Sequence, residues 1–423
     1  MSLPGPARKR VLMLAYYFPP LGGGGVQRTL KHAKYLPAAG FDVIVVTGSG
    51  RGFPLRDPAL ARELSPDTVV LRARTLPLQV ARWKTEGALR RIGLPTWPAS
   101  VIGWPDEMGG WLPGAVHQAL RAVRQYRPDV LYTTSSPVTA HVAGLIVQRV
   151  TGLPWVADFR DPWTRHLYMP RQFTPMARAS EALEQLVTRR LDRVVLADDS
   201  VSVLGVEPDD PRASIIRNGV DAEDLIGLDA AAPPAHFRLS HVGSLYGTID
   251  GAPIFTALRG LLQRGALDRD SFELRFVGDA DVTGHPLLAD LPVTQTGYVD
   301  HGVALREMFC ATALLLHRPS VTRASSGKVF EYLVTRRPVL CVAARDNLAY
   351  RLVEELGAGP CIEPEDAEGI ERAIADLVTE WRTGALTVDQ RVRDETLRRF
   401  SRQALAEQLA DVLREAIQDR TSK

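Results

Sequence analysis

A glycine-rich segment near the start of the sequence has the composition of a loop that approaches a phosphate or a sugar. It reads YFPPLGGGGV from Tyr17 to Val26 and joins a short apolar stretch to one with helical spacing. Glycines let backbone N–H groups approach a ligand, and the first turn of the following helix adds partial positive charge. We expect Gly23, Gly24 and Gly25 to contact the ligand. The segment lacks the GxGxxG and Walker patterns, so nicotinamide and P-loop sites are disfavoured; a plain flexible turn is the alternative.

A second segment places two carboxylates around an arginine directly after a strand-like stretch, in the sequence DFRDPWT from Asp158 to Thr164. A positioned carboxylate can orient a reacting hydroxyl, which suggests a catalytic role for Asp161 with Arg160 beside it. Trp163 offers a flat face for a sugar, so we expect Asp158 and Trp163 to contact an acceptor. A buried structural ion pair is the alternative.

A third segment, ASSGKVFEYL from Ala324 to Leu333, has the pattern of an anion site at a helix start. Ser325 and Ser326 are typical N-cap residues, and Lys328 falls in the first turn, so the segment suits a diphosphate. Glu331 lies one turn further on the same face, where its carboxylate can accept hydrogen bonds from ribose hydroxyls. A surface salt bridge between Lys328 and Glu331 is the alternative reading.

Three strand-like stretches reach a glycine at the point where each strand ends: HVGS, FVGDA and TGYV. Such ends bring the backbone close to a base or a phosphate. The residues expected to contact a donor there are Gly243, Ser244, Gly278, Tyr298 and Val299. No metal is expected, because the DAD sequence at Asp279 lies in an edge of this kind rather than in a metal-like setting.

The elements that position these segments alternate between strands and helices through most of the chain. Strands are expected at Val11–Tyr17, Asp42–Thr47, Val69–Ala73, Val130–Thr134, Trp155–Phe159, Arg193–Ala197, Ser214–Arg217, Arg238–Val242, Glu273–Val277, Val293–Thr296, Ala313–Leu316, Pro338–Val342 and Pro360–Ile362. Helices are expected at Val26–Ala39, Ala115–Tyr126, Thr139–Val150, Ala177–Leu191, Ile254–Arg264, Val303–Phe309, Gly327–Thr335, Asn347–Leu356, Ala367–Thr379 and Val388–Gln418. Strands separated by crossover helices run parallel, so the fold class is α/β with doubly wound sheets.

The length and one irregular stretch divide this pattern into two domains. The 423 residues exceed the ~250–300 that one core usually holds. Leu225–Phe237 has no clear period and contains two prolines, so we place the linker there. The expected domains are 1–230 and 231–400, both Rossmann-like and facing a cleft, and residues 401–423 are expected to form a terminal helix.

Composition narrows the class of protein. The cysteines Cys310, Cys341 and Cys361 are isolated, which disfavours a disulfide framework or a zinc site. No apolar run reaches the ~18–20 residues of a membrane span, and the start lacks a signal-type core, so we expect a cytoplasmic protein. No nucleic-acid-binding module is recognisable.

The charge is uneven although the net charge is only +2: residues 1–100 carry 15 Lys and Arg against 5 Asp and Glu. Such a bias suits an anionic partner or a plain solvated surface. Within it, Arg74–Ala99 mixes basic residues with tryptophans. This stretch fits either a peripheral contact with the inner face of a membrane or a helix packed over the acceptor side.

Taken in order, these motifs resemble the retaining glycosyltransferases of family 4, which have the GT-B fold of two Rossmann-like domains. The resemblance covers nearly the whole chain, and the SGKVFEYL helix before RPVL is its most specific part. It implies donor contacts for Gly23, Gly24 and Gly25, diphosphate binding by Lys328 and ribose binding by Glu331. It also implies backbone contacts of Tyr298 and Val299 with the base. By the same resemblance, 1–230 would bind the acceptor, 231–400 would bind the nucleotide-sugar, and the helix at 401–423 would pack back on the first domain.

The sequence departs from the family pattern at three places. Arg323 stands where the first of two glutamates is common, Ser244 follows Gly243 where an arginine is common, and Arg160 replaces a common histidine. Lys328 is therefore expected to supply more of the charge that stabilises the leaving diphosphate. These departures are similar to those of enzymes that assemble polysaccharides, glycolipids or natural products.

The expected function is transfer of a sugar, of the hexosyltransferase type, from a UDP- or GDP-linked donor to an acceptor hydroxyl with retention. No cofactor beyond this co-substrate is expected. Two alternatives remain: a nucleotide-sugar epimerase of the same fold, for which DFRD would supply acid and base, and a non-catalytic protein that binds nucleotide-sugars or a membrane surface.

Overall fold

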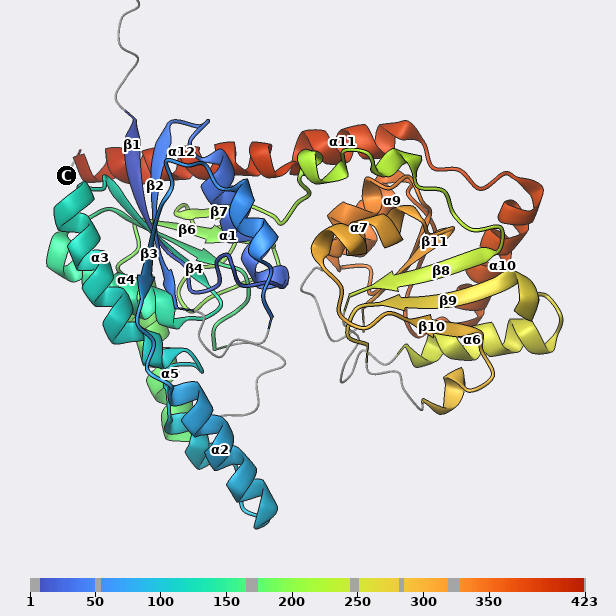
Figure 1. Ribbon diagram of the computed structural model, residues 1–423, viewed down its shortest axis with the longest axis horizontal. Helices are drawn as coiled ribbons and strands as arrows, with labels where there is room; N and C mark the ends of the chain where they lie inside the picture. The colour runs from blue at the N-terminus through green and yellow to red at the C-terminus, as the bar shows by residue number, and fades with distance from the viewer. Residues whose placement is uncertain are drawn as a thin grey trace, which may run out of the picture. The chain divides into compact units, whose positions relative to one another are not determined.

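The computed structural model describes residues 8–49, 55–164, 174–243, 251–280, 285–318 and 327–421. The chain divides into two compact units (Figure 1). The first unit comprises Met1–Arg217 together with Arg402–Lys423, and the second comprises Asn218–Ser401. Within the described residues, each unit is built on one parallel sheet covered by helices, as expected for the GT-B fold.

The sheet of the first unit has seven strands in the order β3-β2-β1-β4-β5-β6-β7. The strands are β1 (Lys9–Leu14), β2 (Phe41–Gly48), β3 (Val69–Ala73), β4 (Val130–Ser135), β5 (Trp155–Phe159), β6 (Arg193–Leu196) and β7 (Ala213–Ile215). The chain winds outward from β1 to β3 and then returns to β4 on the other side, so β1 and β4 flank a switch point where ligands commonly bind.

Side chains alternate between the two faces of this sheet and divide the helices into two layers. Leu12 and Leu14 pack towards α3 (Leu112–Tyr126) and α4 (Thr139–Thr151). Val11 and Met13 face the opposite layer. That layer contains α1 (Gly24–Tyr35) and α12 (Arg402–Thr421), while α2 (Leu78–Arg91) and α5 (Thr174–Thr188) complete the unit.

The sheet of the second unit repeats the same winding with the order β10-β9-β8-β11-β12-β13. Its strands are β8 (Phe237–Val242), β9 (Phe272–Val277), β10 (Val293–Gln295), β11 (Ala313–His317), β12 (Val339–Val342) and β13 (Cys361–Ile362). Its helices are α6 (Ala252–Gln263), α7 (His301–Phe309), α8 (Lys328–Leu333), α9 (Leu348–Leu356), α10 (Ala367–Thr383) and α11 (Gln390–Phe400). The switch point here lies between β8 and β11.

Each strand expected from the sequence is a strand in the structure, with ends that shift by a few residues at most. The expected single helix Val388–Gln418 is wrong, because the backbone of Ser401 is extended and separates α11 from α12. Leu405, Leu409 and Leu413 of α12 are buried with β1 of the first unit.

The boundary between the units differs from the expected one at residue 230. It falls between Arg217 and Asn218, because Val220, Leu225 and Leu228 are buried in the core of the second unit. The short 3-10 helices η4 (Ala222–Leu225) and η5 (Leu228–Ala230) therefore belong to that unit rather than to a linker.

Candidate functional site

The carboxyl edge of the second sheet brings a lysine against a strand-ending glycine at the switch point. Gly243 follows β8 with a φ of 119°, and Lys328 begins α8. A Cβ built on Gly243 would lie 2.0 Å from Lys328 Nζ, so the lysine occupies the space that any side chain at 243 would need. Gly243 therefore permits both the left-handed backbone and the close approach of the amine.

The neighbouring strand β9 ends in Gly278, which packs against the same backbone. Gly278 has a φ of 120°, and a Cβ on it would lie 3.1 Å from backbone atoms of Gly243. Its N–H donates to the carbonyl of Gly297 over 3.0 Å, which closes the edge on the far side. Two adjacent strands thus present bare backbone beside Lys328.

Two cationic side chains lie partly buried at this edge, Lys328 and, after β11, Arg318. Burial and, to a smaller extent, the nearby Arg318 guanidinium lower the pKa of Lys328 to about 8, while Glu331 opposes the shift. Burial also holds the pKa of His241 well below its usual range, with Lys328 contributing in the same direction. An anion bound at this edge would relieve the repulsion between Lys328 and Arg318.

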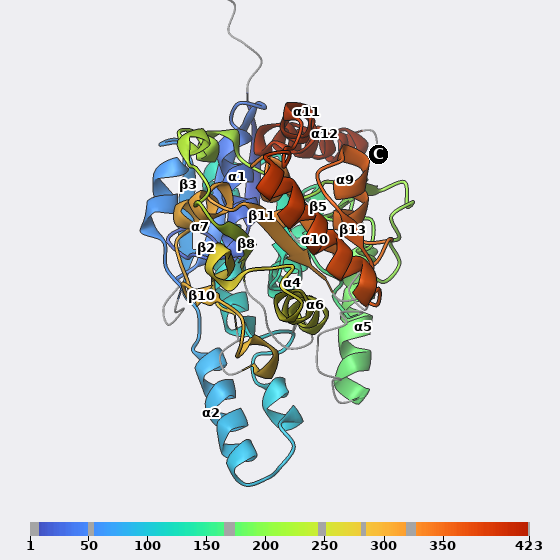
Figure 2. The same ribbon diagram turned by 90° about the vertical axis from the view of Figure 1, so that its right-hand side faces the viewer.

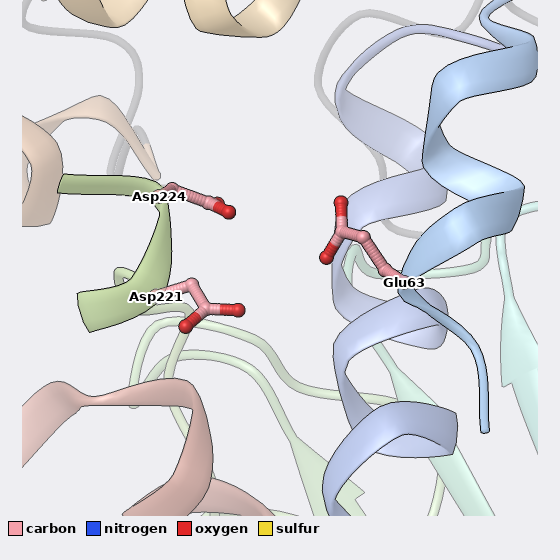
Figure 3. Close-up of side chains that lie close together, drawn as sticks. All are labelled: Glu63, Asp221 and Asp224. Carbon is pink, nitrogen blue, oxygen red and sulfur yellow. The ribbon is translucent and has the colours of Figure 1, made fainter. Parts of the chain in front are cut away.

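Glu331 lies one helical turn beyond Lys328 and faces a histidine. His301 Nε2, at the start of α7, lies 3.7 Å from Glu331 Oε1 and 3.7 Å from Asp224 Oδ2. Asp224 and Asp221 both belong to the η4 segment (Figure 3). Asp221 caps the first turn of η4 by accepting a hydrogen bond from Glu223 N. His301 thus lies between two carboxylates, in a position to orient Glu331, and the sequence analysis missed this residue.

Five further residues of the second unit were expected to contact the donor, and the structure describes two of them. Tyr298 is exposed and Val299 packs on the core, both just after β10. Ser244, Ser325 and Ser326 lie outside the residues that the structure describes.

In the first unit, the glycine loop begins the helix earlier than expected, because α1 starts at Gly24 rather than Val26. Gly23 precedes it with a φ of 92°, and Gly24 is exposed with open space where a side chain would be. The carbonyl of Gly25 accepts a 2.6 Å hydrogen bond from the Arg160 guanidinium. A loop of this kind presents backbone rather than side chains to a ligand.

Arg160 holds this loop to the end of the neighbouring strand. Besides Gly25, its guanidinium donates to the carbonyls of Ser135, the last residue of β4, and of Ser136, the latter over 2.6 Å. Because β1 and β4 flank the switch point, the hydrogen bonds of Arg160 connect the segment after β1 with the end of β4. Asp161, next to it, is half-buried at the carboxyl end of the sheet.

The structure contradicts the expected acceptor contact of Asp158. This carboxylate is fully buried and accepts hydrogen bonds from Arg28, Tyr132 and Thr134. Burial alone would raise the pKa of Asp158, but the Arg28 guanidinium holds it well below its usual range. Asp158 is thus the buried structural ion pair that the sequence left open, although its partner is Arg28 rather than Arg160.

Trp163 is also wrong as an acceptor contact, because only 7% of it is exposed and it packs in the core beside His141. A large aromatic residue after a strand fits a sugar platform or a core equally well in sequence.

The helix α1 carries polar residues that the apolar spacing did not single out. Arg28, Lys31 and His32 are buried on it. Lys31 Nζ lies 2.6 Å from the carboxylate of Glu63, which ends η1 (Pro58–Glu63) and is drawn in Figure 3. The basic composition of the helix was the available signal, but nothing in the sequence identified the partners.

Comparison with known proteins finds a family model that matches part of the chain. Residues 23–202 match the model of the family described as glycosyl transferase 4-like domain. A search of curated proteins finds no significant match.

Solved structures resemble the chain over nearly its full length. Sucrose-phosphate synthase from Thermosynechococcus elongatus is 15% identical, with a TM-score of 0.67 and coverage of 97% of this chain and 100% of that one. HepE of Anabaena, solved with UDP and glucose, is 16% identical, with a TM-score of 0.60 and coverage of 96% and 99%.

A trehalose-phosphate synthase from Burkholderia xenovorans, solved with glucose-6-phosphate, is 12% identical, with a TM-score of 0.62 and coverage of 96% and 100%. The chain thus has the GT-B fold of these structures, and its residues 23–202 match a glycosyl transferase 4-like domain.

Proposed function

We propose that the protein transfers a hexosyl group from a nucleoside-diphosphate sugar to a hydroxyl group of an acceptor, with retention at the anomeric carbon. The observation that carries this proposal is the contact of Lys328 with the backbone of Gly243 at the switch point of the second unit. A cation against bare backbone, with Arg318 nearby, suits a diphosphate. HepE was solved with UDP, which favours a uridine donor.

In the proposed reaction the acceptor oxygen forms a bond to the anomeric carbon while the bond from that carbon to the diphosphate oxygen breaks. The nucleoside diphosphate leaves with the electron pair, and its phosphate oxygen takes the acceptor proton. Lys328 and Arg318 stabilise the charge that grows on the leaving group. Glu331, oriented by His301, binds the ribose hydroxyls.

The first unit supplies the acceptor side in this proposal. Its glycine loop, held by Arg160, presents backbone N–H groups to the transferred sugar. Asp161 is half-buried next to Arg160, which holds the loop, and once Asp158 is assigned to Arg28 we assign to Asp161 the orientation of the acceptor hydroxyl. No step of this scheme calls on a metal.

The test is a thermal-shift screen of UDP, GDP, ADP and their sugars against the wild type, Lys328→Ala and Glu331→Ala. A ligand at 100 times its dissociation constant adds about 2.7 kcal/mol of stability. We expect one nucleotide, UDP, to stabilise the wild type and both variants to lose that stabilisation. The matched controls are Arg264→Ala and Glu371→Ala, which break an exposed ion pair of the same unit and should respond as the wild type does.

Activity is then measured as release of nucleoside diphosphate with a panel of hydroxyl acceptors, and NMR assigns the anomeric configuration of the product. Stabilisation without turnover would favour a binding protein, and conversion of the sugar without transfer would favour an epimerase. If no nucleotide stabilises the wild type, the donor site is assigned wrongly.

A further inference from the structure

The helix α2 extends away from the sheet of its unit in both views (Figures 1 and 2). None of its residues is buried. Its partners are the 3-10 helices η2 (Trp97–Val101) and η3 (Gly109–Trp111) that follow it. We refer to residues 76–104 as the α2 projection. A soluble helix normally buries one face, so its exposed apolar residues require an explanation.

The α2 projection concentrates exposed apolar side chains on a short stretch of chain. The exposed large apolar residues there are Leu76, Val80, Trp83, Ile92, Leu94, Trp97, Val101 and Trp104. Ile92, at the end of α2, is 68% exposed. The described remainder of the first unit has only Ile146, Val150 and Leu186 of this kind. Exposed apolar side chains are therefore concentrated in the projection rather than scattered over the unit.

The base of the projection is held firmly. Trp104 Nε1 donates to Ser180 Oγ of α5 over 3.2 Å, and Leu76 N donates to Gly110 O over 2.9 Å. A Cβ on Gly109 would lie 1.9 Å from the carbonyl oxygen of Gly103, so the chain segments at Gly103 and Gly109 pack backbone to backbone at the base. These contacts fix the base of the projection to the rest of the first unit, so its exposed apolar residues are held in a defined position.

The projection carries an excess of basic side chains, which favours an anionic partner. Residues 76–104 contain Arg82, Lys84, Arg90 and Arg91 against the single acid Glu86, which pairs with Arg82 over 2.9 Å. Lys84, Arg90 and Arg91 are exposed on α2, as are Trp83 on the same helix and Ile92 directly after it. Tryptophan beside basic residues suits the interface of a bilayer with anionic headgroups, where apolar side chains enter the acyl boundary and cations meet phosphate.

We propose that the α2 projection docks the protein on an anionic membrane surface. Its exposed apolar side chains insert at the headgroup level, and Lys84, Arg90 and Arg91 contact the lipid phosphates. The described residues contain no helix long and apolar enough to cross a bilayer, so in this part of the chain membrane contact would be peripheral. This proposal does not depend on the proposed sugar transfer.

The experiment is vesicle flotation of the whole protein with phosphatidylcholine alone and with phosphatidylcholine containing about 30% phosphatidylglycerol. We expect the wild type to float only with the anionic vesicles and to be released by salt. The variant Lys84→Gln/Arg90→Gln/Arg91→Gln should bind about 100-fold more weakly, since each basic residue contributes a several-fold factor. The variant Trp83→Ser/Ile92→Ser/Trp97→Ser should also lose binding.

The matched controls replace basic and apolar residues that are exposed elsewhere in the same unit. Arg121→Gln/Arg124→Gln/Arg149→Gln and Ile146→Ser/Val150→Ser change exposed residues of α3 and α4 and should float as the wild type does. Circular dichroism and the melting temperature verify that every variant is folded.

Three results would overturn the proposal. The first is equal flotation with neutral vesicles or none at all, and the second is wild-type flotation of both projection variants. The third is a wild type that is dimeric without lipid and becomes monomeric in the tryptophan variant, which would make the projection an interface between two copies of the chain. Nucleotide binding, measured separately, is expected to be unchanged in all variants.

Discussion

The guanidinium of Arg28 and the carboxylate of Asp158 form a bidentate ion pair in the interior of the first unit, with N–O distances of 2.9 and 2.8 Å. Both side chains are almost completely inaccessible to solvent. Arg28 also donates to the carbonyls of Ile216 and Arg217 beyond β7, over 2.8 and 2.9 Å. The pair thus joins α1, β5 and the end of the sheet.

Removing one partner should strongly destabilise the protein. We expect Asp158→Ala to cost about 3–5 kcal/mol, because it leaves a buried guanidinium without its counter-charge. Urea denaturation of the variant measures this cost. The exposed pair Arg264–Glu371 is the control, and Glu371→Ala should cost about 0–1 kcal/mol. Equal midpoints for Asp158→Ala and the wild type would contradict the structural role.

Gly243→Ala should weaken donor binding without unfolding the protein. The added Cβ would lie 2.0 Å from Lys328 Nζ and must displace the amine. We expect nucleotide affinity to fall by at least about tenfold, which is about 1.4 kcal/mol. Titration calorimetry with UDP measures it. Gly265→Ala, at a positive φ of 69° with open space around it, is the control for backbone strain alone and should bind as the wild type does.

Nucleotide affinity should fall as the pH rises above about 8. Burial lowers the pKa of Lys328 to about 8, so its amine is charged below that pH and loses the proton above it. Only the charged form stabilises the diphosphate, and one linked proton weakens binding by up to about tenfold per pH unit. Calorimetry from about pH 7 to about pH 9.5 measures this slope. Lys328→Met should bind weakly and lack the slope, and a flat wild-type profile would show that the lysine is not the group that titrates.

Arg160→Lys should impair transfer while leaving donor binding unchanged. A single ammonium cannot reproduce the fork that reaches the carbonyls of Gly25, Ser135 and Ser136. A misplaced glycine loop is expected to lower kcat about 100-fold. Steady-state kinetics and UDP calorimetry together separate the two effects. Arg149→Lys on the exposed face of α4 is the control, and a matching loss of UDP affinity in Arg160→Lys would exclude a role confined to positioning the loop.

The sequence alone was sufficient to predict the strands and the winding of both sheets. Parallel strands are covered on both faces, so they appear as short continuous apolar runs such as ALLL in β11 and VLCV in β12. It also placed Lys328 and Glu331 one turn apart, because helical spacing is a local property.

Tertiary structure alone decided which polar residues meet. Arg28 and Asp158 are 130 positions apart, and Lys328 meets the glycine at 243 only because β8 and β11 are neighbours in the sheet. His301 was missed for the same reason, since its contacts with Asp224 and Glu331 join three separate elements. The burial of Trp163, like the pairing of these charges, depends on residues that are distant in the sequence and pack against it in the fold. Local patterns fix the type of each element, whereas contacts between distant elements determine which of its side chains are buried and which are available for chemistry.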